Sequence, residues 1–122
     1  MTWTDEEIKQ LEAASTIQNK PFGPDKATFT EDNPVWEVVV DGRLYIRGGN
    51  GTASHWYVNG TKNGGHIRLG NQEYAVDYRA VSDPAEVQAV TDAYQAKYHG
   101  QYPIDMMVED RAAQATVELV KR

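Results

Sequence analysis

The first forty residues begin with an amphipathic helical pattern. Ile8, Leu11 and Ala14 recur at the three-residue spacing that places side chains on one helix face. This spacing predicts a helix over residues 5–15. The stretch Thr4–Glu7 fits a capping box, in which the threonine hydroxyl and the glutamate carboxylate each accept a backbone N–H.

A second helix is predicted in the later part of the chain. Asp83 suits the N-cap position, Pro84 the first helical position and Glu86 the third. A mostly apolar stripe then continues until Gly100, which ends the pattern. The prediction is a helix that packs one face against the rest of the molecule.

Between and after these helices, β-branched and aromatic residues gather in short runs. Two pairs of such runs are each joined by a tight glycine-containing turn, which is typical of hairpins. In the first pair, Val35–Val40 and Leu44–Ile46 are joined by the turn Asp41-Gly42. In the second pair, Gly65–Leu69 and Glu73–Tyr78 are joined by the turn Gly70-Asn71. A further run, Ala115–Val120, predicts a closing strand.

These elements predict an α+β fold that is mainly β. Two hairpins, a final strand and peripheral helices favour a small domain built around a barrel or curved sheet. No crossover helix separates the strands of either hairpin, which excludes a parallel pairing there. Linkers, repeats and low-complexity tracts are missing from the sequence, so residues 1–122 are expected to form a single domain.

Composition narrows the function classes. The 122 residues include no cysteine, which excludes disulfides, Cys-ligated zinc and a thiol nucleophile. The apolar runs are far shorter than the roughly 20 residues that span a bilayer, so no membrane association is expected. The acidic start Met1–Glu7 is unlike a signal peptide, and a cytoplasmic protein is therefore predicted.

Charge is unevenly distributed along the chain. The formal net charge is −6, yet residues 41–75 hold four basic and two acidic side chains. An acidic chain lacks the dense basic face that nucleic-acid binding needs, so no nucleic-acid partner is expected. A small anion needs only a local positive pocket, and the basic segment could provide one or could simply be solvated surface.

The candidate site lies within this basic segment. Arg47 ends a predicted strand, and the glycine-rich stretch Gly48–Ser54 leads into a short helix through Trp56 that Thr52 or Ser54 would cap. A glycine loop before a helix N-terminus can bind an anion through backbone amides. The predicted contacts are Arg47, Asn50, Gly51, Thr52, Ser54 and Trp56. The alternative is a purely structural strand-to-helix turn.

Other chemistry has less support. His55, His66 and His99 lack the spacing of a metal site, and Ser54 beside His55 cannot converge on it as a hydrolase pair must. The acidic residues of the stretch 105–110 are interpreted as solvated loop and cap residues. The sequence therefore identifies no catalytic residue and no metal ligand.

The chain resembles a known superfamily over nearly its whole length. The segments that carry the resemblance are Trp3–Glu7, Val35–Arg47, His55–Asn59, Ala93–Tyr98 and Arg111–Val117. They are similar to the FMN-binding split-barrel superfamily, which includes pyridoxamine-phosphate-oxidase-like proteins and deazaflavin-dependent nitroreductases. Within it, the chain looks most like the bacterial family DUF2255.

The resemblance implies a six-stranded antiparallel split β-barrel with peripheral helices, usually a homodimer. In relatives that bind a cofactor, its phosphate lies at the loop that matches Arg47 to Trp56. Oxidase relatives place a lysine two residues after the loop serine, where this chain has Trp56. The stretch Gln18–Phe22 also lacks the basic motif of the deazaflavin-dependent relatives.

Two functions from different classes follow. In the first, the chain binds FMN or a deazaflavin coenzyme and acts as a small oxidoreductase, with Arg47 as the anion anchor and the cofactor carrying the hydride. In the second, it is a cofactor-free small-molecule-binding or dimeric interaction module. Under the first, Arg47→Ala should weaken ligand binding and leave the fold stable.

Overall fold

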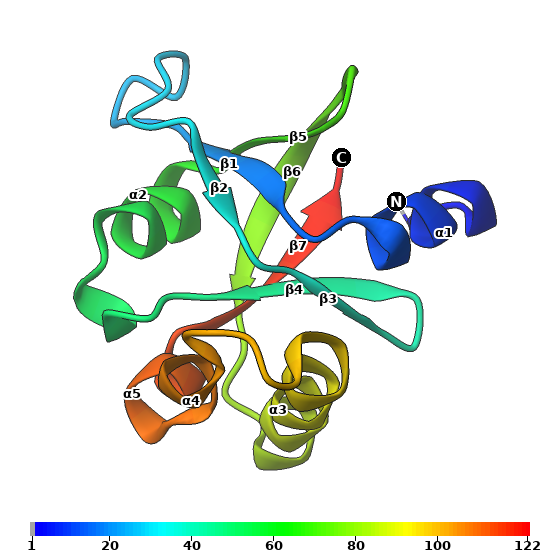
Figure 1. Cartoon of the computed structure of the whole chain (residues 1–122). Coiled ribbons are helices and arrows are strands. Elements are labelled where there is room, and N and C mark those ends of the chain that lie inside the picture. The colour runs from blue at the N-terminus through cyan, green and yellow to red at the C-terminus, as the bar shows by residue number, and fades with distance from the viewer. Residues whose placement is uncertain (1) are drawn as a thin grey trace.

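The strands of the chain form one antiparallel sheet. A computed structural model describes residues 2–122. In sheet order the strands are β2 (Asn33–Val35), β1 (Ile17–Pro21), β5 (Gly65–Leu69), β6 (Gln72–Ala80), β7 (Thr116–Lys121), β4 (Arg43–Arg47) and β3 (Val38–Val40). Figure 1 shows that the sheet curls strongly, so that its first and last strands approach each other. The result is an open half-barrel.

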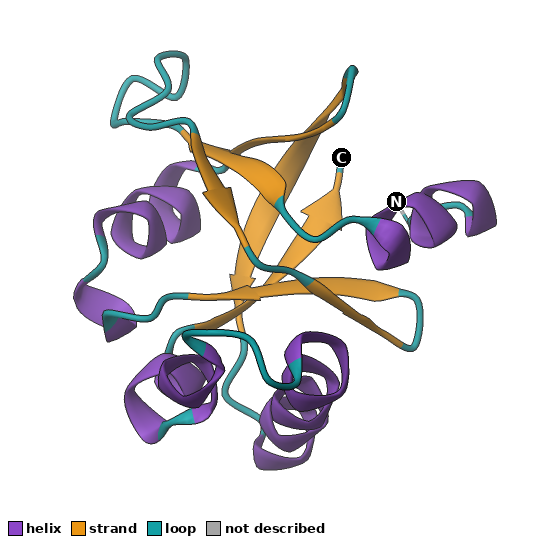
Figure 2. Cartoon of the chain, viewed as in Figure 1, coloured by secondary structure: helices purple, strands orange, loops and turns teal. Residues whose placement is uncertain are grey.

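Helices surround this curled sheet (Figure 2). The helices are α1 (Asp5–Ala13), α2 (His55–Asn63), α3 (Pro84–Tyr98), α4 (Ile104–Val108) and α5 (Asp110–Gln114), with a single 3₁₀ turn, η1 (Gly51–Ala53). Helix α2 packs on β1 and β6, whereas α3 packs on β3 and on α4. The predicted α+β class is confirmed.

The expectation of six strands is wrong, because the sheet has seven. The run predicted as one strand over Val35–Val40 is divided at Trp36 and Glu37, whose backbone groups bond to side chains of α3. The Glu37 N–H donates to Tyr98 Oη at 3.0 Å, and the Trp36 carbonyl accepts from Tyr94 Oη at 3.1 Å. Val35 therefore belongs to β2, which pairs with β1 at one edge of the sheet. Val38–Val40 form β3, which pairs with β4 at the other edge.

The turns and helix starts follow the sequence closely. Asp41 and Gly42 both have positive φ, at 52° and 76°, as the tight turn between β3 and β4 requires. Thr4 and Glu7 form the predicted capping box, and Asp83 caps α3 by accepting from the Glu86 N–H at 2.9 Å. Helix α1 ends at Ala13, two residues before its predicted end.

The buried side chains form two clusters. The larger one fills the curl of the sheet and includes Trp3, Leu11, Trp56 and Tyr78. The smaller one lies between the β3–β4 hairpin and α3, and it includes Tyr45, Tyr94 and Tyr98. The two clusters hold both ends of the glycine-rich segment in place, since Trp56 belongs to the first and Arg47 borders the second.

Candidate functional site

The glycine-rich segment connects the end of β4 to α2. The Gly48 N–H donates to the Ala115 carbonyl at 3.3 Å, which ties the start of the segment to the residue before β7. Gly51 has a φ of 77°, in the region that favours glycine, and its N–H donates to the Gly48 carbonyl at 2.9 Å. Turn η1 then leads into α2 at His55.

Side chains of α4 and α5 pack closely on two of the glycines, although the Met106 side chain that contacts Gly49 is exposed and can move. A Cβ on Gly49 would lie 2.7 Å from the terminal methyl of Met106, and one on Gly51 would lie 2.8 Å from Cγ of Arg111. Helices α4 and α5 therefore lie directly over the segment. This contact supports the structural interpretation of the glycines beside the ligand-binding one.

Three of the six predicted site residues come together around one pocket. Asn50, Ser54 and Trp56 line a cavity of about 410 Å³, with Gly49, Ala53, His55 and Glu31 as the other lining residues. Gly51 is buried and Thr52 is exposed, and neither lines the cavity. The pocket thus uses the predicted segment, but its wall also carries a carboxylate.

Ser54 occupies the N-cap position of α2 without capping it through its side chain. Its hydroxyl donates to the Gly51 carbonyl at 2.8 Å and accepts no bond from the first turn of the helix. The N–H groups of that turn, which includes His55 and Trp56, have no acceptor within the helix. Ser54 is thus the N-cap residue, as one of the two predicted alternatives has it, but the expected side-chain hydrogen bond is not formed.

Arg47 lies away from this pocket, in the interior of the protein. It is only 2% exposed. Its Nε donates to Thr116 Oγ1 at 2.9 Å, and its terminal nitrogens donate to the carbonyls of Met107 at 3.1 Å and Val87 at 2.8 Å. The guanidinium carbon lies 5.7 Å from the centre of the Tyr94 ring. Each guanidinium nitrogen thus has an internal acceptor, and burial lowers the pKa of Arg47.

Trp56 is largely packed into the core. It is 9% exposed, and its ring lies 6.0 Å from the ring of Tyr57 and 6.3 Å from that of Tyr78. Helix α2 can lie this close to Tyr78 because residue 60 is glycine, where a Cβ would meet the ring at 2.5 Å. Only a small edge of the indole is therefore available to a ligand.

Local sequence patterns did not predict that Glu31 lines the pocket or that helices α4 and α5 lie over the loop. Glu31 reaches the pocket because β2 pairs with β1, a contact that no spacing within residues 47–56 reveals. Helices α4 and α5 have only five residues each, too few to show a helical period. The acidic residues Asp105 and Asp110, interpreted from sequence as loop and cap residues, lie in the first turns of these helices.

The lining of the pocket differs from what the phosphate of FMN or a deazaflavin coenzyme needs. Such a group needs donors and positive charge, yet Arg47 has committed its donors elsewhere and Glu31 brings a negative charge to the same wall. Asn33 Nδ2 donates to Glu31 Oε1 at 3.2 Å. The residues present do not fit the predicted phosphate site.

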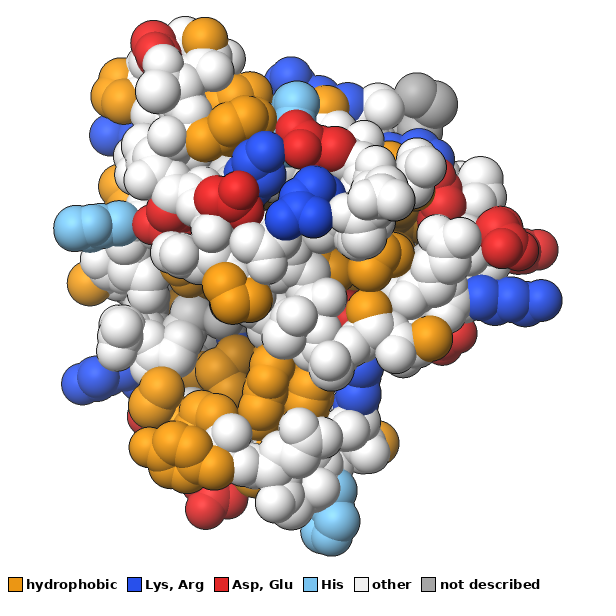
Figure 3. Space-filling view, turned by 45° about the horizontal axis from the view of Figure 1, so that its top comes forward, with side chains coloured by type: hydrophobic (Ala, Val, Ile, Leu, Met, Phe, Trp, Pro, Cys, Tyr) orange, Lys and Arg blue, Asp and Glu red, His pale blue; other side chains and the backbone are white. Residues whose placement is uncertain are grey.

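The surface has a second notable feature, which includes Met106 above Gly49. Figure 3 shows hydrophobic side chains gathered around a hollow in the lower part of one face. Of the described residues, Val58, Tyr102 and Met106 are the large hydrophobic side chains that are exposed, and Tyr102 is 95% accessible. Tyr102 and Met106 line a pocket of about 700 Å³ formed mainly by residues 99–106. These side chains could contact a partner or a ligand.

Within residues 2–122, no helix is long and apolar enough to cross a membrane. Within the same range, histidine and acidic side chains form no group of three or more that could hold a metal ion.

Comparisons with known proteins place the chain by family and by fold. A family described as "Uncharacterized protein conserved in bacteria (DUF2255)" matches residues 7–119. The crystal structure of the conserved hypothetical protein Rv2991 from Mycobacterium tuberculosis is similar, with a TM-score of 0.74 at 18% sequence identity. The match covers 100% of this chain and 82% of the Rv2991 chain. No curated protein matches the chain.

Proposed function

We propose that this chain, which belongs to the bacterial family DUF2255, is a cofactor-free module that binds a small polar molecule in the pocket between the glycine-rich segment and Glu31. The proposal takes the second of the two functions that the sequence left open. It replaces the oxidoreductase as the favoured function because the anion anchor on which that function depended is used inside the fold.

The observation that carries the proposal is the set of Arg47 hydrogen bonds. Three internal acceptors occupy the guanidinium, and Thr116 Oγ1 is itself oriented by donating to the Ala113 carbonyl at 2.6 Å. Turning Arg47 toward the pocket would leave these buried acceptors unpaired, at about 1–3 kcal/mol for each group. A phosphate at the pocket would have to supply that free energy before gaining any affinity.

The chemistry of the pocket indicates the class of ligand. Glu31 offers a hydrogen-bond acceptor, and the first-turn N–H groups of α2 at His55 and Trp56 offer donors. A ligand that presents both an N–H and a carbonyl, as amides and imides do, can pair with both sides. A phosphate presents only acceptors and would face the carboxylate.

The proposal is tested by comparing FMN with riboflavin, which differ only in the phosphate. Both are titrated into the protein, and quenching of tryptophan fluorescence is followed. We expect FMN to bind no more tightly than riboflavin, because Arg47 donates inside the fold and the carboxylate of Glu31 lines the pocket. Saturable FMN binding at least tenfold tighter than riboflavin binding would overturn the proposal and restore the oxidoreductase. The deazaflavin coenzyme is then titrated in the same way.

The polar ligand class is tested with neutral probes. Uracil and nicotinamide carry the imide and amide groups that the pocket can pair, and binding is measured by the shift in melting temperature. We expect Glu31→Gln to weaken the binding of any probe that stabilises the protein. Asp32→Asn is the matched control, because Asp32 is the neighbouring carboxylate and does not line the pocket.

The broader predictions from the split-barrel resemblance remain part of the proposal. We propose that the curled sheet belongs to the FMN-binding split-barrel superfamily and that the chain acts as a homodimer in the cytoplasm. The open, antiparallel half-barrel and the bacterial family support this assignment. Light scattering on the purified protein should give twice the 13.7 kDa mass of one chain, and a monomer would contradict the dimer.

A further inference from the structure

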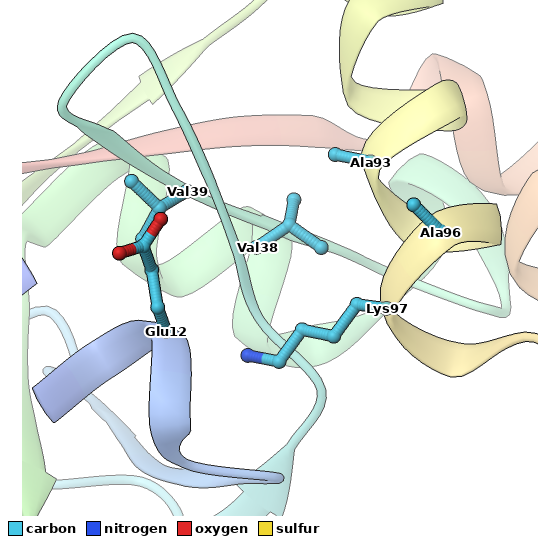
Figure 4. A pocket seen from close by; sticks show the side chains of 6 residues that line it. All are labelled: Glu12, Val38, Val39, Ala93, Ala96 and Lys97. Atoms are coloured by element: carbon cyan, nitrogen blue, oxygen red, sulfur yellow. The ribbon is translucent and has the colours of Figure 1, made fainter. Parts of the chain in front are cut away.

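A buried acid–base pair lies where the sheet is interrupted. The Glu37 side chain is 0% exposed and contacts Lys97, which belongs to α3. In Figure 4 the Lys97 side chain extends from α3 past Val38 toward α1, along one wall of a pocket that Glu12 also lines. The pair therefore sits at the junction of α1, α3 and the link between β2 and β3.

Lys97 connects these three parts of the fold. Its ammonium group donates to Glu37 Oε1 at 2.8 Å, to the Glu37 carbonyl at 2.9 Å and to the Leu11 carbonyl in α1 at 3.3 Å. An ammonium has three donors, and all three are used. The neighbouring Tyr98 hydroxyl adds a bond to the Ser15 carbonyl at 2.8 Å, just beyond α1.

Fewer of the polar atoms of the Glu37 side chain have a hydrogen-bond partner than in Lys97. Its Oε2 is buried, and no hydrogen-bond donor from the described residues reaches it. An ionised carboxylate with an unpaired buried oxygen pays a large desolvation cost. A neutral carboxylic acid pays less, although an O–H at Oε2 also finds no acceptor among the described residues. The closed junction therefore favours the protonated side chain.

We infer that Glu37 is a proton-controlled latch: in its protonated form it holds α1 and α3 against the break between β2 and β3, and its ionisation promotes local opening of that junction. The opening brings water to Oε2 and gives the carboxylate the donors that the closed structure lacks. Because the side chain of Leu11 anchors α1 in the large cluster, whereas its carbonyl accepts from Lys97, the opening is confined to the junction.

The electrostatic surroundings agree with this direction. Burial raises the pKa of Glu37 to about 7, against the opposing effect of the Lys97 hydrogen bond and charge. The other titratable groups at the junction are Glu12 on α1 and Tyr94 and Tyr98 on α3. Burial raises the pKa of both tyrosines, so they stay protonated near neutral pH. Glu37 is thus the group that changes charge there.

Linkage gives the pH range of the effect. The closed state holds a proton up to pH about 7, and in the open state the carboxyl returns toward its ordinary pKa of 4.5. Between these values the closed state binds one more proton than the open state. The equilibrium constant for opening should then rise by as much as tenfold per pH unit and become constant above pH 7.

The backbone amide of Glu37 reports this opening directly, since it donates to Tyr98 Oη inside the junction. Amide hydrogen exchange is measured by NMR from pH 5 to 8 and corrected for the intrinsic pH dependence of exchange. We expect protection of this amide to fall at least tenfold across the range in the wild type and to stay constant in Glu37→Gln. Glu12→Gln is the matched control and should keep the wild-type slope.

A second measurement does not depend on any variant folding. The side-chain carboxyl carbon of Glu37 is followed by NMR in the wild type as the pH is raised. A titration midpoint between pH 6 and 8 supports the latch, and a midpoint below 5 overturns it. Constant protection of the Glu37 amide in the wild type, or an equal slope in Glu37→Gln, would also overturn it.

Discussion

The molecule buries two oppositely charged side chains against α3, and they are satisfied to different degrees. Arg47 finds an acceptor for each of its three guanidinium nitrogens and lies near the face of Tyr94. Glu37 keeps one oxygen paired with Lys97 and the other without a donor. Both side chains are at most 2% exposed, so burial alone does not distinguish them.

The difference shows what each charge can do. A buried charge with complete hydrogen bonding is fixed in one protonation state and one orientation, and it organises the elements around it. Arg47 does this for β7, α3 and α4. A buried charge with an unpaired oxygen is in a poor environment for its ionised form, so it responds to pH. The sequence highlighted the first as a functional residue, whereas the structure indicates that the second is the responsive one.

Removal of the Arg47 side chain should have the largest effect on stability. Arg47→Ala leaves two buried carbonyls and the Thr116 hydroxyl without their donor and opens a cavity, which should cost roughly 3–4 kcal/mol of unfolding free energy. Urea denaturation measures the change. Arg43→Ala, at the exposed start of the same strand, is the matched control and should stay within about 0.5 kcal/mol of the wild type.

A small loss of stability in Arg47→Ala would mean that the internal hydrogen bonds are dispensable. The side chain would then be free to serve the pocket, as the sequence analysis predicted. Loss of ligand binding together with an unchanged urea midpoint would be the clearest sign of that role.

The second prediction concerns global stability at Glu37. Because the folded-state pKa is raised above the ordinary value of 4.5, the stability that Glu37 contributes is complete below pH 4.5 and is lost as the pH rises to about 7. The loss should reach up to about 3 kcal/mol. Glu37→Gln does not titrate at this position. The unfolding free energy of the variant, relative to that of the wild type, should therefore rise between pH 5 and 7.

The difference between variant and wild type is the quantity to compare. The other titratable groups are common to both proteins, so their contributions cancel in the difference. A difference that stays constant from pH 5 to 8 would show that Glu37 does not titrate in this range.

The sequence predicted the local elements well and the long-range contacts poorly. The turn at Asp41-Gly42 and the caps at Thr4 and Asp83 depend on neighbouring residues, and the structure confirms them. Strand β1 was missed because Asn19, a polar residue, takes a buried position and bonds Tyr78 Oη at 2.6 Å, across 59 residues. No local pattern marks such a position as part of a strand.

The same limit applies to the candidate site. Glycines and a helix start are local signals, and part of the segment that they mark, including Asn50, Ser54 and Trp56, lines a pocket. The role of Arg47 depends on partners 40 to 69 residues away, at Val87, Met107 and Thr116. An arginine at a strand end looks the same in sequence whether it faces solvent or the core.

Removing a hydroxyl from either tyrosine of α3 should change stability least. Tyr98 lies beside Glu37 and Tyr94 lies beside Arg47. Tyr98→Phe removes the acceptor of the buried Glu37 N–H and the donor to the Ser15 carbonyl, and should cost about 1–3 kcal/mol. Tyr94→Phe removes one bond to the Trp36 carbonyl and keeps the ring near Arg47, so about 0.5–1.5 kcal/mol is expected. Urea denaturation of both variants at pH 6 gives the order. If Tyr94→Phe is the more damaging, the hydroxyl beside Arg47 contributes more than the one beside Glu37, and the junction at Glu37 is less tightly held than its hydrogen bonds indicate.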